Sequence, residues 1–198
     1  MSQESVPHLV NFVYEAFGVQ CAALLMIGLG EESAQAEKKF YVQETVDGGV
    51  RHWEIGVVAN ALPYRSEPLV LAALLKMLLR HKTVPFTLEF QVSEVMEELL
   101  RAGVAITYEH VDRIIAKYIA LSYDKREKSD EESDGAGGGM YSLLVGYLRG
   151  SVKEAGASDL ARVSNSVQFD QSFVVGLRRG DVVLAGIPFG KLGGIAAY

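Results

Sequence analysis

The feature that most limits what this chain can fold into is a helix-forming segment with almost no charge. Residues 53–80 read WEIGVVANALPYRSEPLVLAALLKMLLR, which is a β-rich run, a proline turn and a long apolar stretch. The pattern predicts a helix over 67–81, with Ser66 as its N-cap and Pro68 in its first turn. A helix that is apolar nearly all round must be covered on every side. The sequence therefore predicts a central core helix with the other elements packed around it.

The composition is that of a globular protein with a substantial core. The chain has 198 residues, of which 49% are hydrophobic and 22% charged, enough for one large domain or two small ones. Cys21 is the only cysteine, which excludes a disulfide within the chain and a cysteine-built zinc site and suits a cytoplasmic location. The apolar run 19–29 is too short to cross a membrane, which takes about 20 residues, so we expect no membrane association.

Secondary structure follows from the spacing of apolar residues and from turn signals. We expect a helix over 6–29, a polar connector or short exposed helix over 31–39, and a β-hairpin over 40–58 around Asp47-Gly48-Gly49. A β-like run over 83–90 then precedes two helices, over 91–103 and 107–121. The first should bury Val92, Val95, Met96, Leu99 and Leu100 and end at Gly103, and the second, capped by Thr107, should bury Val111, Ile114, Ile115, Tyr118 and Ile119.

The last third of the chain is predicted to be mainly β-structure. Residues 122–150 read as a hairpin with a polar, glycine-rich tip over 124–139, which we expect to be mobile. A further β-rich run over 162–186 follows, with Arg178-Arg179 at a hairpin turn on the surface.

Three helices followed by a β-hairpin predict an α+β winged-helix fold. In this interpretation the helices over 91–103 and 107–121 form the helix-turn-helix and the 122–150 hairpin is the wing. The expected organisation is an N-terminal helix and connector over 1–39, a winged-helix domain over 40–192 and a tail over 193–198.

No catalytic or cofactor motif is present. The four histidines lack the HExxH spacing of a zinc protease, and the sequence has neither a GxxxxGK[ST] phosphate loop nor a GxSxG nucleophile turn. We expect no enzyme activity, no metal and no cofactor.

The 107–121 helix is the strongest candidate for a binding surface. With the apolar stripe inward, its outer face carries basic and aromatic side chains at the spacing of a DNA recognition helix. The candidate residues are Tyr108, His110, Arg113 and Lys117. An ordinary solvated helix face is the alternative, and Glu109 and Asp112 support it.

The predicted wing adds three candidate phosphate contacts, Lys125, Arg126 and Lys128. Six acidic residues between 124 and 134 surround them, which favours the alternative of a solubilising loop. The net charge of −6 also opposes tight non-specific DNA binding by this chain.

A set of packing residues resembles the plasmid replication initiator protein A family (RepA-type). The pattern runs from about residue 40 to 192. It comprises Trp53, Leu62, Pro63, Val70, Leu71 through Leu78, Phe86, Leu99, Gly103, Tyr108, Arg113-Ile114 and the run SVQFDQSFVVGLRRGDVVLAG. The chain departs from the family pattern at Ala61, where glycine is usual, at Ser66-Glu67-Pro68, and in its recognition helix, which has few basic residues.

The resemblance implies a winged-helix initiator that binds repeated sites in the double-stranded DNA of a plasmid origin. Such proteins help to open the duplex for host replication proteins, and they often repress their own gene as dimers. Phe17, Leu24 and Leu25 in the apolar N-terminal helix are the candidate dimer contacts, and a second winged helix would follow Tyr198. Two alternatives remain open, a dimerisation or protein-interaction module with DNA binding elsewhere, and a winged-helix transcriptional repressor.

Overall fold

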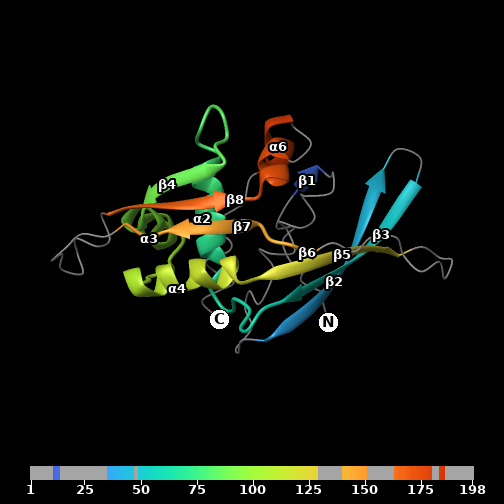
Figure 1. The fold of residues 1–198 in the computed structure, drawn as a ribbon, viewed down its shortest axis with the longest axis horizontal. Helices are drawn as coiled ribbons and strands as arrows, with labels where there is room; N and C mark the ends of the chain where they lie inside the picture. Colours follow the sequence, from blue (N-terminus) through green and yellow to red (C-terminus); the bar gives the residue numbers. More distant parts are fainter. Residues whose placement is uncertain are drawn as a thin grey trace, which may run out of the picture.

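The computed structural model describes residues 11–13, 35–46, 49–128, 140–150, 163–179 and 183–185. They form an α+β fold whose centre is helix α2, Pro68–Leu78 (Figure 1). All eleven of its residues are buried except Lys76, so the prediction of a core helix is confirmed. Pro68 stands in the first turn as expected, but the helix ends at Leu78 and its N-cap is Glu67 rather than Ser66.

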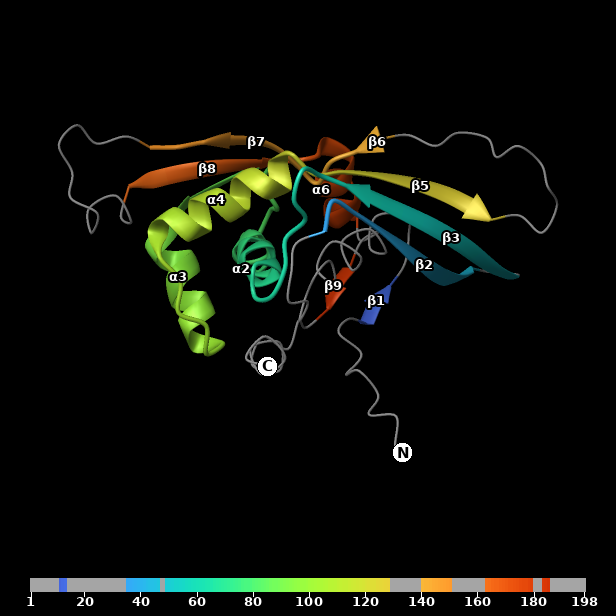
Figure 2. The same ribbon diagram turned by 90° about the horizontal axis from the view of Figure 1, so that it is seen from below.

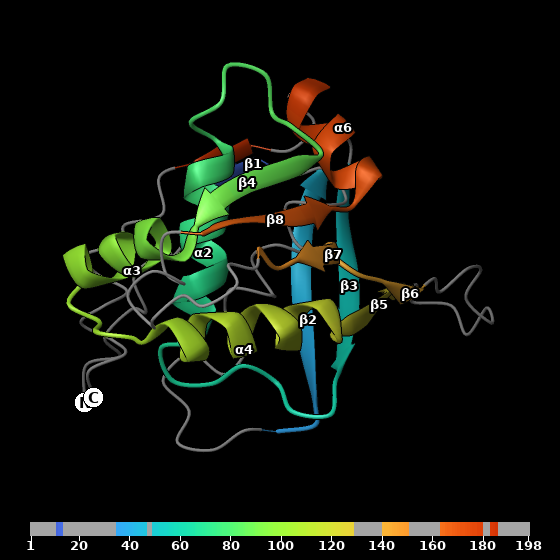
Figure 3. The same cartoon turned by 60° about the vertical axis from the view of Figure 1, so that its left-hand side comes forward.

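Helices α3 (Val92–Arg101) and α4 (Tyr108–Ile119) pack against α2, and a three-stranded antiparallel sheet completes this unit. The sheet consists of β4 (Thr87–Gln91), β8 (Ser164–Phe169) and β7 (Leu144–Leu148), in that order. Figure 3 shows β4, β8, β7 and α4 following one another across the molecule. The chain order α2–β4–α3–α4–β7–β8 is that of a winged helix, so the predicted fold class is confirmed.

The wing is not where the sequence placed it. The connection between the last two strands of the winged helix runs from 149 to 163, between β7 and β8. Strand β5 (Ser122–Lys128), which was expected in the wing, instead pairs along its whole length with β3. Its expected hairpin partner, β6 (Met140–Tyr141), forms only two residue pairs with it. Strand β5 lies between β3 and β6, so the predicted antiparallel pairing of β5 with β6 is present, but it belongs to this separate sheet and not to the wing.

The early hairpin is confirmed and becomes part of a second sheet. Strands β2 (Glu37–Val46) and β3 (Gly49–Val58) pair in antiparallel register, with Val46 opposite Gly49. The sheet order is β2-β3-β5-β6, and Figure 2 shows its strands extending away from the three helices. Because β2 begins at Glu37, the predicted 31–39 connector is too long at its C-terminal end.

The helix predicted over 6–29 is wrong where the structure describes that segment. Residues Asn11–Val13 form strand β1, which pairs with β9 (Val183–Ala185), where a helix was expected. A phenylalanine and a β-branched valine suit a strand. The rest of the 6–29 segment, with Phe17, Leu24 and Leu25, lies outside the described residues. No helix within the described ranges is long and apolar enough to cross a membrane.

Arg178 and Arg179 end helix α6 (Gln171–Arg179) instead of forming a hairpin turn. Asp170 explains the helix, because its Oδ1 accepts hydrogen bonds from the backbone N–H groups of Ser172 and Phe173. At the other end Arg178 donates to the carbonyl oxygen of Val84 and lies 4.3 Å from the ring centre of Phe86. These contacts hold α6 against the segment that leads into β4.

Helix α3 departs from the apolar stripe expected for it. Val92, Val95 and Leu99 are buried and Gly103 follows the helix with φ +81°, as the sequence predicts, but Leu100 is 65% exposed. Glu98 is buried instead, with 2% of its surface exposed.

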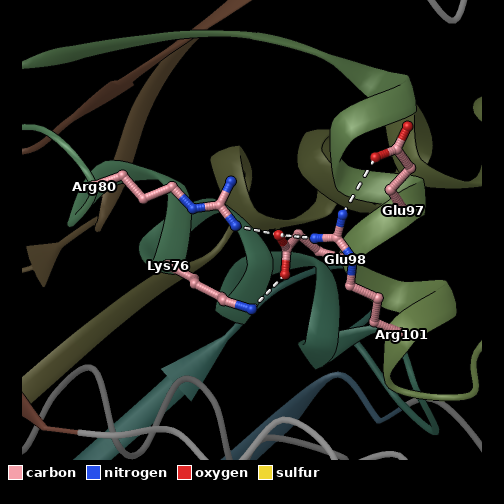
Figure 4. Close-up of polar contacts among 5 residues, drawn as sticks. All are labelled: Lys76, Arg80, Glu97, Glu98 and Arg101. Carbon is pink, nitrogen blue, oxygen red and sulfur yellow. Dashed lines mark hydrogen bonds and ion pairs between the residues drawn. The ribbon is translucent and has the colours of Figure 1, made fainter.

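The burial of Glu98 is explained by three cations (Figure 4). Its carboxylate accepts from Lys76 at 2.5 Å, from Arg101 at 2.6 Å and from Arg80. Burial alone raises the pKa of Glu98, but the hydrogen bonds and charges of Lys76 and Arg80 more than offset it, and this pKa lies below its ordinary value. The cluster ties α2 to α3 through a charged carboxylate.

The Glu98 cluster makes stability depend on acid pH. A group whose pKa is lowered by folding contributes stability above its unfolded pKa, here near the ordinary value of 4.5, and this contribution is lost as pH falls through the folded value. We expect the urea midpoint of the wild type to fall more steeply below about pH 4.5 than that of Glu98→Gln. Glu97→Gln is the control, because Glu97 is 67% exposed. Identical pH profiles for wild type and Glu98→Gln would contradict this assignment.

Candidate nucleic-acid interface

The outer face of α4 is open, as the sequence predicts. Val111, Ile114, Ile115 and Tyr118 are buried against the core, whereas Ile119 is only partly buried. The opposite side exposes Glu109, Arg113, Ala116 and Ala120. Thr107 is the N-cap residue, although its side chain makes no cap hydrogen bond. The amphipathic pattern therefore places the face correctly.

One edge of this face is tied to the turn that precedes α2. Lys117 Nζ lies 2.6 Å from Glu67 Oε2, and His110 Nε2 lies 4.0 Å from Glu67 Oε1. Lys117 also lies 5.0 Å from the ring centre of Tyr64. Because Glu67 holds it, the Lys117 side chain is only 17% exposed and is not on the open surface predicted for it. His110 and Arg113 do project together, with 2.6 Å between His110 Nε2 and Arg113 Nη2.

The other edge of the face is tied to the end of β7. The hydroxyl of Tyr147 donates to Asp112 Oδ1 at 3.0 Å, and Arg149 Nη2 lies 2.8 Å from Asp112 Oδ2. Tyr147 stacks on Phe90, and Arg149 lies 5.8 Å from the ring centre of Tyr147. Burial and the hydrogen bond to Asp112 raise the pKa of Tyr147, which keeps its hydroxyl a donor. Asp112 thus fixes the first residue of the wing beside α4.

The remaining predicted DNA contacts are not on the open face of α4. Tyr108 is half-buried and packs against the core cluster. Lys125, Arg126 and Lys128 belong to β5, where their backbones pair with residues 55, 54 and 52 of β3. They are therefore in the second sheet and not in the wing, and only their backbone positions are described.

Sequence reasoning missed the residues at both edges. Glu67 was predicted only as the start of the 67–81 helix, and Tyr147 and Arg149 only as part of the 122–150 hairpin. Their roles depend on contacts between residues 35 or more positions apart, so a local pattern gave no signal for them. One sequence signal was present for Tyr147 and Arg149, namely the acidic residue Asp112, to which both bind. From the sequence alone, Asp112 supports the alternative of a solvated helix face.

The charge of this region differs from that of the whole chain. Four permanent cations lie on or beside the α4 face, against three carboxylates, whereas the chain carries −6. The cations are Arg65, Arg113, Lys117 and Arg149, and the carboxylates are Glu67, Asp112 and Glu109. Glu67 and Asp112 are already paired, so Glu109 is the acid among these that no ion pair offsets within the described region. No group of three metal-ligating side chains occurs within the described ranges.

Comparisons with known proteins support the fold. Neither the protein-family models nor the curated proteins gave a match. Two solved structures of domains 2 and 3 of RctB are similar to this chain. One, from selenomethionine derivatives, has a TM-score of 0.54 at 13% identity and covers 78% of this chain and 57% of that one. The other, RctB-155-483, has a TM-score of 0.53 at 12% identity and covers 80% and 59%.

This chain therefore spans less than three fifths of each RctB chain that it matches. At this level of identity the likeness concerns the fold, and it agrees with the winged-helix arrangement described above.

Proposed function

We propose that this chain is the DNA-binding winged-helix domain of a replication initiator of the plasmid RepA type. Two independent lines support the proposal, the resemblance of its packing residues to that family and its structural likeness to domains 2 and 3 of RctB. The observation that carries the DNA-binding part is the outer face of α4, where Arg113 is exposed and a cation is held at each edge by a carboxylate.

The geometry suggests how such a domain binds. A major groove about 12 Å wide admits one α-helix. With α4 in the groove, His110 and Arg113 face the base edges or the adjacent phosphates, and Arg149 approaches the backbone from the wing. The small excess of positive charge predicts modest affinity, so we expect the chain to act as a dimer on repeated origin sites, together with host replication proteins.

Arg113→Ala tests the assignment of α4. We expect it to weaken binding and to lower the slope of log K against log salt by about one, as loss of one phosphate contact does. The measurement is fluorescence anisotropy at several salt concentrations on a duplex enriched from a randomised library, with its scrambled sequence beside it. Lys82→Ala is the matched control, because the loop between α2 and β4 lies on the side opposite α4 (Figures 1 and 3).

Two results would contradict the assignment. One is an Arg113→Ala variant that binds with wild-type affinity and slope. The other is failure of the wild type to enrich or bind any duplex at low salt.

A protein-interaction module is the second candidate, and the net charge of −6 favours it. In that case α4 serves recruitment or dimerisation, and another part of the protein binds DNA. Sedimentation would then show a concentration-dependent dimer that Leu24→Asp or Leu25→Asp dissociates, with no retardation of duplex DNA. A transcriptional repressor would use the same contacts as the initiator on a different target.

A further inference from the structure

The turn that leads into α2 contains a strained residue beside the α4 face. Arg65 has φ +54° and is the only non-glycine residue with positive φ in the described ranges. A side chain at Cβ disfavours this left-handed region, which glycine and asparagine adopt more readily. The residue type at this position is therefore unfavourable for the backbone that it adopts.

Contacts on both sides of Arg65 hold the turn closed. The backbone N–H of Glu67 donates to the carbonyl oxygen of Tyr64 at 3.0 Å, and the backbone N–H of Tyr64 donates to Glu67 Oε2 at 3.1 Å. The same carboxylate pairs with Lys117 of α4. Glu67 thus fixes both the shape of the turn and its position against α4.

This arrangement leaves the Arg65 side chain exposed at the edge of the α4 face. Its guanidinium carbon lies 5.6 Å from the ring centre of Tyr64, and Lys117 Nζ lies 5.0 Å from the same centre. His110 and Lys117 mark this edge, whereas Asp112 and Arg149 mark the other. At 100° per residue, positions 110 and 112 lie on nearly opposite sides of a helix. Arg65 and Arg149 therefore flank the outer face of α4 from two separate segments.

We propose that Arg65 is a phosphate-contacting residue, and that the DNA interface consists of the 64–67 turn, the outer face of α4 and the end of β7. Arg65 and Arg149 meet the backbones on the two sides of the groove that α4 enters. Strained backbone persists where the surrounding structure enforces it and is concentrated at functional sites, and a guanidinium suits a phosphate partner. The inference rests on the DNA-binding role proposed above. It adds a contact between Arg65 and the phosphate backbone on the second side of the groove.

The strain allows a test that separates function from folding. Arg65→Asn and Arg65→Gly remove the cation while suiting the left-handed backbone better. We expect both variants to melt at or above the wild-type temperature, to bind the enriched duplex more weakly and to lower the salt slope by about one. Arg65→Lys, which keeps the charge, should restore the wild-type slope.

The outcomes distinguish this inference from the function on which it rests. Wild-type affinity and slope for Arg65→Asn, alongside weakened binding by Arg113→Ala, would overturn the role of Arg65 and leave the function standing. A lowered melting temperature for both Arg65→Asn and Arg65→Gly, with an unchanged salt slope, would make Arg65 a structural residue. No duplex binding by the wild type would overturn both proposals.

Discussion

Leu75→Ala is expected to lower the free energy of unfolding by about 3.5 kcal/mol, the middle of the range for a buried leucine. Leu75 is 0% exposed in the middle of α2, where the helices and the sheet of the winged-helix unit meet. The cavity left by its side chain cannot close without shifting several elements. Urea unfolding followed by circular dichroism measures this loss.

Leu100→Ala is the matched control, because it removes the same atoms from α3 at a site that is 65% exposed. We expect a change within about 0.5 kcal/mol. Equal losses for Leu75→Ala and Leu100→Ala would contradict the placement of α2 at the centre of the core.

Lys117→Ala is expected to cost about 2 kcal/mol of stability, because removal of one partner leaves a buried charge unpaired. Glu67 is only 7% exposed, and Lys117 is its closest cation. The loss is smaller than for a fully isolated carboxylate, since Glu67 still accepts from the Tyr64 backbone N–H. The double variant Glu67→Gln/Lys117→Ala should recover part of the loss, which a double-mutant cycle measures.

The single variant Lys117→Ala also distinguishes a structural role of Lys117 from a DNA-contacting role. If Lys117 holds the turn to α4, the salt slope of DNA binding stays at the wild-type value while stability falls. Arg113→Ala should show the reverse, a lowered slope with nearly unchanged stability, because Arg113 is exposed. A stable Lys117→Ala protein with a lowered salt slope would contradict the structural role.

The helices of the winged-helix unit could be predicted because their information is local. Apolar residues at helical spacing identify α3 and α4, and the near absence of charge identifies α2 as the core helix. Asp47-Gly48 between two β-rich arms likewise predicts the β2–β3 hairpin, which the register confirms.

The strand pairing could not be predicted in the same way. Neighbouring strands were paired because hairpins are local, but Ser122–Lys128 pairs with β3, some 70 residues earlier in the chain. Helix α6 was missed because Phe173, Val174 and Val175 favour strands, whereas Asp170 caps a helix. The burial of Glu98 could not be predicted because two of its three cations, Lys76 and Arg80, come from α2 and the turn that follows it.

The candidate site was predicted only in its centre. The outer face of α4 follows from its amphipathic pattern, with Arg113 exposed on it and His110 beside Arg113 toward the Glu67 edge. The edges depend on Glu67, Tyr147 and Arg149, whose partners are distant in sequence. The wing was misplaced because β5, the strand that follows α4, pairs with β3 in the second sheet and is not part of the three-stranded sheet of the winged helix.

Amide chemical-shift mapping of the isotope-labelled chain, titrated with the enriched duplex, is the most direct test of α4 as the DNA-binding element. We expect the largest changes in α4, in residues 64–67 and in residues 147–150, and little change in the β2–β3 sheet and in the loop between α2 and β4. Changes confined to that sheet or loop, or a spectrum that the duplex leaves unaltered at low salt, would contradict α4 as the DNA-binding element.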